Sequence, residues 1–176
     1  SLGWVKPLVI ADIRARAASF VANWKDEPGD EKQQAQTFVR DLLQVFGISE
    51  KAAALYEKRA RRASTGLHGY IDALITGTAL FEMKSAGKDL VAAEQQALDY
   101  IESLSENEKP HTVICSDFKR FRILDLMAAD GLDVLEFPLE DLPNHVEDLL
   151  FLAGYKRKAS TVTEEQASVK AAQLMA

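Results

Sequence analysis

The chain has 176 residues, 47% of them apolar, and a net charge of −6 at neutral pH. This length suits one domain with its own hydrophobic core. No apolar run approaches the roughly 20 residues of a membrane helix, and the start shows no signal-peptide pattern, so we expect a cytoplasmic protein without a membrane partner. The single cysteine, Cys115, lies in an apolar run and is expected to be a buried strand residue.

The first part of the chain is predicted to be helical. Helices are expected over roughly 7–23, 32–46 and 50–62, because apolar residues recur there at helical spacing. The segments Pro28-Gly29-Asp30 and Gly47-Ile48-Ser49 provide the breaks, with Asp30 and Ser49 as capping residues.

Residues 69–84 predict two short strands joined by a tight turn at Gly77. Side chains alternate along a strand, so Glu82 and Lys84 share one face and Met83 points to the other. If the hairpin is centred on Gly77, Asp72 lies directly opposite Glu82. Paired positions of this kind have Cβ atoms roughly 5 Å apart, which lets two carboxylates share one cation.

These residue types fit metal-dependent hydrolysis of a phosphodiester. Mg²⁺ prefers hard carboxylate oxygens and keeps several waters of its own, so Asp72 and Glu82 are the expected ligands, with the backbone carbonyl of Met83 as a third. Lys84 would add a fixed positive charge where negative charge develops. The alternative is an ordinary solvated ladder of charged side chains on a strand.

The rest of the chain predicts one further amphipathic helix followed by strands. The helix covers 88–103, and Gln96 and Tyr100 share one of its faces. Strands are expected over 112–115, 121–126 and 134–137, then a helix over 142–151 and a last helix that starts near Thr161. This order favours an α/β fold in which a mixed central sheet has helices on both faces.

The ordered motifs Gly69-x-x-Asp72, Glu82-x-Lys84 and Gln96-x-x-x-Tyr100 resemble the signature of the PD-(D/E)XK nuclease superfamily in its RecB-like form. The wider chain is similar to the N-terminal nuclease domain of MmeI-like type IIL restriction-modification enzymes. The matching segments cover roughly residues 20 to 126 and are Asn23 to Lys25, Ala35 to Phe38 with Phe46-Gly47, Gly69 to Asp72, Glu82 to Leu90, Glu94 to Tyr100, Pro110, and Cys115 to Arg122.

The resemblance implies a restriction-endonuclease-like nuclease domain over 1–158, with a helical part over 1–65 and a catalytic core over 66–158. Residues 159–176 would begin a helical connector to a DNA adenine-N6 methyltransferase, which would use S-adenosylmethionine and of which this chain carries no motif. Bacterial or archaeal origin, double-stranded DNA as substrate, Mg²⁺ or Mn²⁺ as cofactor and dimerisation for double-strand cleavage are also implied. The implied catalytic residues are Asp72, Glu82, Lys84, Gln96 and Tyr100, and the auxiliary candidates are Glu57, His68, Ser85 and Lys88.

The acidic balance limits what this domain does alone. A protein that binds DNA by itself is usually basic, because phosphate contacts supply most non-specific affinity. Basic clusters occur within 51–62, 119–122 and 156–158, each with a solvated surface as the alternative. We therefore expect DNA affinity to come mostly from other domains. Two other functions stay open: a stand-alone RecB-like exonuclease of DNA repair or phage, and a catalytically silent docking domain of the same fold.

Overall fold

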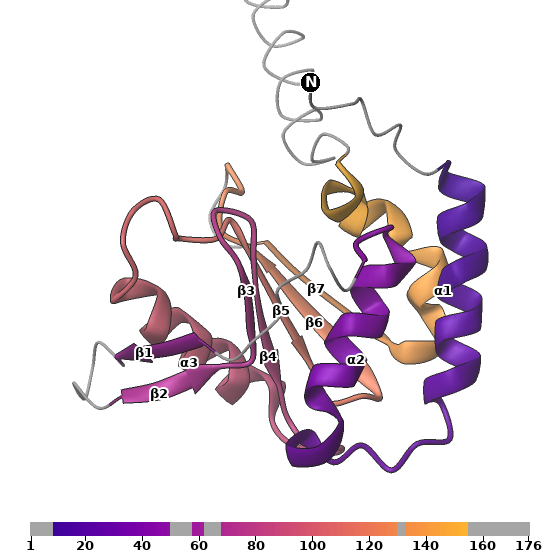
Figure 1. Ribbon diagram of the computed structural model, residues 1–176, viewed down its shortest axis with the longest axis horizontal. Helices are drawn as coiled ribbons and strands as arrows, with labels where there is room; N and C mark the ends of the chain where they lie inside the picture. Colours follow the sequence, from indigo (N-terminus) through magenta and orange to yellow (C-terminus); the bar gives the residue numbers. More distant parts are fainter. Residues whose placement is uncertain (1–8, 50–57, 62–67, 130–132, 155–176) are drawn as a thin grey trace, which may run out of the picture.

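The computed structural model describes residues 9–49, 58–61, 68–129 and 133–154, with the backbone alone for 58–61 and 68–70. Its centre is a five-stranded sheet in the order β3-β4-β5-β6-β7, with helices on both faces (Figure 1). The β4–β5 pair is parallel and the other pairs are antiparallel, which confirms the predicted mixed sheet. The strands are β3 (Ala73–Ile75), β4 (Ala79–Met83), β5 (Thr112–Ser116), β6 (Arg120–Asp125) and β7 (Asp133–Pro138).

Two α-helices and two 3-10 helices cover one face of this sheet. They are α1 (Ile10–Trp24), α2 (Glu31–Val45), η1 (Leu139–Asn144) and η2 (Val146–Ala153). Their core is aromatic: the ring of Phe38 lies with its centroid 5.0 Å from those of Phe20, Trp24 and Phe118. The segment predicted as a helix over 142–151 is helical, but it belongs to the two 3-10 helices η1 and η2. Pro143, which cannot donate a backbone hydrogen bond, lies within η1.

Helix α3 (Leu90–Glu102) covers the opposite face. It begins after Asp89, whose side chain accepts hydrogen bonds from the backbone N–H of Val91 (2.9 Å) and Ala92 (3.3 Å). Its apolar stripe packs on the alternate residues of the central strands. The buried cluster between them comprises Ile71, Leu80, Leu90, Ala93, Ala97, Tyr100, Ile101, Leu104, Val113, Cys115 and Leu124.

One predicted helix is wrong over part of its length. Strand β1 (Lys58–Arg61) occupies the end of the segment expected to be helical over 50–62, and it pairs antiparallel with β2 (His68–Ile71). Lysine, arginine and alanine favour helices, but pairing with a neighbouring strand overrides so weak a preference. Residues 50–57, and the last helix expected after residue 158, lie outside the described ranges.

The hairpin around Gly77 has the predicted register. Ala73 lies opposite Phe81, and Ile75 opposite Ala79, so the turn is centred on Gly77, which has a φ of +69°. Continuing that register by one position sets Asp72 opposite Glu82. The expected first strand is divided, however, because the chain bends at Asp72 between β2 and β3.

Candidate functional site

Glu82 lies on the face of the sheet that α3 covers, because it alternates with Phe81 and Met83 and shares a face with Leu80, which packs beneath α3. Asp72 is half-buried, and its Oδ2 accepts a hydrogen bond of 2.7 Å from the backbone N–H of Met83. The Glu82 side chain is buried, with 3% of the residue exposed. The Met83 side chain packs into the opposite core, against α1 and α2. Continuing the hairpin register by one position sets the two acids opposite each other.

Lys84 and Gln96 meet between the sheet and α3. The Lys84 Nζ donates a hydrogen bond of 2.9 Å to the Gln96 Oε1, and the Lys84 backbone N–H donates to the carbonyl of Ser116 (2.9 Å). Both ends of the lysine are therefore held. Tyr100, expected on the same face as Gln96, is 3% exposed and belongs to the apolar cluster beneath α3.

The segment after Lys84 is tied to distant parts of the chain. The Ser85 Oγ accepts from the backbone N–H of Glu31 (3.1 Å), which gives this auxiliary candidate a structural contact at the start of α2. The backbone N–H of Gly87 donates to the Asp117 Oδ2 at 3.0 Å. Lys88 is exposed at the end of this segment. Glu57 lies outside the described residues, and for His68 the structure describes the backbone, in β2.

Asp117 is an organising residue that the motif analysis did not single out. It is 1% exposed, and its Oδ1 accepts from the backbone N–H groups of Lys119 (3.1 Å) and Arg120 (2.8 Å) in the β5–β6 turn. An aspartate between two apolar runs is a known turn signal, because its carboxylate accepts from the backbone two residues on. The same carboxylate therefore fixes the turn and, through Gly87, the segment after Lys84.

A row of mostly polar residues crosses the sheet from Glu82 on β4 to Glu136 on β7. In register, Glu82 lies next to Cys115, Cys115 next to Arg122, and Arg122 next to Glu136. The Arg122 Nε and Nη2 bind the Oε2 of Glu94 on α3 at 3.0 and 2.9 Å. Burial raises the pKa of the Cys115 thiol, the negative charges of Glu82 and Glu94 raise it further, and nearby cations oppose them. The thiol is therefore protonated, and the site is densely charged.

The basic cluster at 119–122 is engaged in contacts within the chain. The Lys119 Nζ donates to the carbonyls of Lys25 (3.0 Å) and Glu27 (2.7 Å), and an Arg120 nitrogen donates to the carbonyl of Lys88 (3.2 Å). Arg122 is occupied by Glu94. These contacts favour the structural interpretation of this cluster over a dedicated phosphate-binding role.

The donor set at the site fits a hard divalent cation. Asp72 and Glu82 supply carboxylate oxygens, and the Met83 backbone lies between Glu82 and Lys84, beside the Asp72 carboxylate. Among the described residues there is no group of three or more His, Cys, Asp or Glu side chains with metal-binding geometry. Two carboxylates suit Mg²⁺, which retains several water ligands, better than a metal that needs four protein ligands. The ligand set itself stays a prediction.

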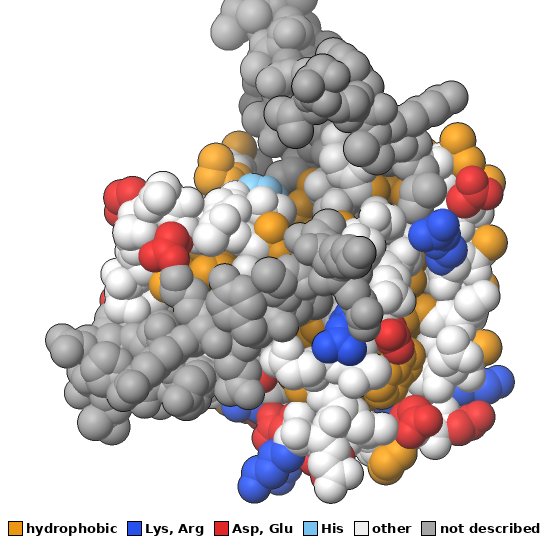
Figure 2. All heavy atoms as spheres, viewed as in Figure 1, with side chains coloured by type: hydrophobic (Ala, Val, Ile, Leu, Met, Phe, Trp, Pro, Cys, Tyr) orange, Lys and Arg blue, Asp and Glu red, His pale blue; other side chains and the backbone are white. Residues whose placement is uncertain are grey.

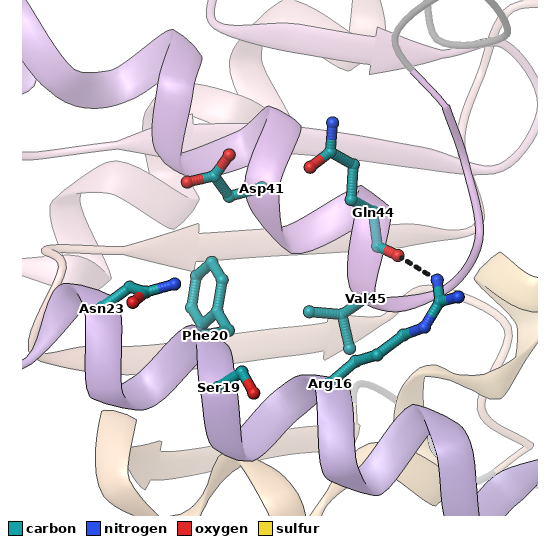
Figure 3. Close-up of a pocket in the computed structure, with 7 residues that line it drawn as sticks. All are labelled: Arg16, Ser19, Phe20, Asn23, Asp41, Gln44 and Val45. Atoms are coloured by element: carbon teal, nitrogen blue, oxygen red, sulfur yellow. Dashed lines mark hydrogen bonds between the residues drawn. The ribbon is translucent and has the colours of Figure 1, made fainter.

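A separate groove of about 360 Å³ opens between α1 and α2 (Figure 3). Its charged residues have partners there: the Arg16 Nη1 donates to the carbonyl of Gln44 (3.1 Å), and the Asp41 Oδ2 accepts from the Trp24 Nε1 (3.0 Å). It lies between the two helices that cover the sheet face opposite α3, whereas Glu82 lies on the α3 face. We assign it no part in the site.

Comparison with known proteins identifies a family. Among the described helices, none has the length and apolarity that a membrane crossing requires. No curated protein and no solved structure matches the chain significantly. The family model described as "MmeI, N-terminal domain" matches residues 15–176. The chain therefore belongs to the family of MmeI N-terminal domains, which are restriction-enzyme-related domains, as its motifs predicted.

Proposed function

We propose that the chain is a Mg²⁺-dependent DNA endonuclease domain of a restriction-modification enzyme. The observation that carries the proposal is the register of the β3–β4 hairpin, which, continued by one position, sets Asp72 opposite Glu82, two positions before a lysine held by Gln96 on α3. Two acids and a lysine at this spacing match what hydrolysis of a phosphodiester needs. Membership of the family supports the same assignment.

In this proposal Asp72 and Glu82 hold the cation, together with the Met83 carbonyl. When bound, Mg²⁺ neutralises phosphate charge and increases the acidity of a coordinated water. The Lys84 ammonium stabilises negative charge on the phosphate oxygens, and its bond to Gln96 fixes where that positive charge lies. Asp72 keeps its orientation through the bond from the Met83 N–H. Tyr100 supports α3 through packing and is assigned no chemical step.

DNA would bind mainly through parts of the enzyme other than this domain. On the face drawn in Figure 2, lysine and arginine side chains are interspersed with aspartate and glutamate over the described residues. A mixed surface with a net charge of −6 gives little non-specific affinity for phosphate. We propose that two copies meet when both strands are cut, and that methyl transfer from S-adenosylmethionine belongs to another domain.

The cation is tested by calorimetric titration of Mn²⁺ into wild type and Asp72→Asn. The asparagine keeps an oxygen that can accept from the Met83 N–H, so loss of affinity reports the lost charge. Asp133→Asn, an exposed acid at the start of β7, is the matched control and should bind as wild type does. Equal affinity in wild type and Asp72→Asn would favour the docking domain.

Catalysis is tested by Lys84→Ala, assayed for cleavage of plasmid DNA in the enzyme that contains this domain. The variant should lose cleavage while circular dichroism shows an intact fold, because the side chain is half-buried and makes one side-chain hydrogen bond to Gln96. Cleavage at the wild-type rate would refute the assigned role of Lys84.

A further inference from the structure

We infer that Gln36, on α2, is a positioning residue for Asp72. In this way α2, which packs on the sheet face opposite α3, sets the geometry of the acid pair. The inference rests on the proposed function and deepens it. Gln36 touches no reacting group in this scheme. It acts through the backbone of the residue that carries the carboxylate.

The contact itself is short and well placed. The Gln36 Nε2 donates a hydrogen bond of 2.8 Å to the carbonyl oxygen of Asp72, across 36 positions of sequence. Gln36 is half-buried and follows Ala35, which is part of the core between α2 and the sheet. The glutamine therefore reaches Asp72 from a helix whose place is already fixed by packing.

Asp72 is the residue of the acid pair that most needs such support. It lies at the bend between β2 and β3, whereas Glu82 lies inside β4, which is paired on both sides. With the bond from Gln36 to its carbonyl and the bond from Met83 to its carboxylate, Asp72 is held at both ends. The bond from Gln36 restrains the backbone directly after the Asp72 Cα, from which the carboxylate branches, and so limits how far that Cα can shift.

The start of α2 also binds the segment that follows Lys84. The Glu31 N–H donates to the Ser85 Oγ (3.1 Å), and the Ala86 N–H donates to the carbonyl of Gly29 (3.0 Å), just before α2. One helix and its entry loop therefore contact the chain at Asp72 and again directly after Lys84. This arrangement makes the separation of acid and lysine depend on α2.

The test compares Mn²⁺ affinity in the full chain across variants of one helix. Gln36→Leu removes the donor at similar volume, and Gln36→Lys keeps a donor that can reach the carbonyl. Gln33→Leu, an exposed glutamine three residues earlier on α2, is the matched control. Because groups that orient metal ligands typically contribute 10- to 100-fold in affinity, Gln36→Leu should weaken Mn²⁺ binding by about tenfold or more. Gln36→Lys and Gln33→Leu should bind close to wild type.

A purely structural role would give a different pattern. It would lower the melting temperature of Gln36→Leu and leave the dissociation constant of the folded protein unchanged, and that result overturns the inference. If Gln36→Leu does not fold, Gln36→Glu replaces it, since a carboxylate facing the Asp72 carbonyl removes the bond without changing the shape. Weak binding by Asp72→Asn with normal binding by Gln36→Leu refutes this inference alone. Wild-type binding by Asp72→Asn refutes the proposed function and the inference together.

Discussion

Removing Arg122 should destabilise the protein strongly, because its partner Glu94 is buried. The Arg122 side chain is 17% exposed and the Glu94 side chain 10%. Arg122 makes two bonds to the Glu94 Oε2, at 3.0 and 2.9 Å, and one to Glu136 at 2.8 Å. In Arg122→Met the apolar stem is retained, while the buried carboxylate of Glu94 loses its counter-charge.

The size of the effect follows from the burial of each pair. Breaking a buried ion pair from one side costs about 3–5 kcal/mol, and the residual exposure here reduces that to about 2–4 kcal/mol. The contact with Glu136, whose side chain is 43% exposed, adds about 0–1 kcal/mol. Replacing both buried partners, in Arg122→Met with Glu94→Leu, should restore stability to within about 1 kcal/mol of wild type, because no uncompensated charge remains.

Urea denaturation followed by tryptophan fluorescence measures these differences, since Trp24 lies in the core and reports its unfolding. Lys109→Met is the control for an exposed pair: its partner Glu106 has a side chain that is 91% exposed, so this variant should cost about 1 kcal/mol or less. A loss below about 1 kcal/mol for Arg122→Met, or a double variant no more stable than it, would refute the argument from burial.

Three other changes have defined outcomes. Gly29→Ala should lower the free energy of unfolding by about 1–3 kcal/mol in urea titrations, because Gly29 has a φ of +79° and a Cβ there would lie 3.0 Å from Ala86. Phe38→Ala should cost about 3–5 kcal/mol and Phe38→Leu clearly less, by the same measurement, since the ring is fully buried among aromatic side chains. Burial raises the pKa of the Cys115 thiol in the folded chain, so above about pH 8.5 the unfolded chain ionises first. Stability should then fall by up to about 1.4 kcal/mol per pH unit, and Cys115→Ala should lack that part of the slope.

The local parts of the site could be predicted from the sequence. Alternation along 79–84 assigns Glu82 and Lys84 to one face and Met83 to the other, and the glycine at 77 sets the register that brings Asp72 opposite Glu82. The four-residue spacing between Gln96 and Tyr100 likewise indicates a shared helix face. Each of these inferences uses neighbours within one turn or one hairpin, where geometry is fixed by the backbone.

The parts that could not be predicted depend on contacts between distant segments. Strand β1 consists of residues that favour helices, and its partner β2 begins only at His68. Arg122 looked like part of a basic surface, but its partner Glu94 is 28 positions earlier on another element. The contact between Gln36 and Asp72 has no local signal either. Charge and periodicity can be read from the sequence, whereas the partner of each charged side chain depends on how distant elements pack together.

The β5–β6 turn connects the packing of α1 and α2 with the candidate site. Phe118 has a φ of +71°, which is a genuine outlier for a bulky residue and costs about 1–3 kcal/mol. Two things hold it: its ring packs against Trp24 and Phe38, and the neighbouring Asp117 accepts the backbone hydrogen bonds of the turn. Because Asp117 also binds the Gly87 N–H, the packing of α1 and α2 that keeps Phe118 in place also fixes the segment after Lys84. The helices are therefore part of the site's geometry, although none of their side chains belongs to the proposed chemistry.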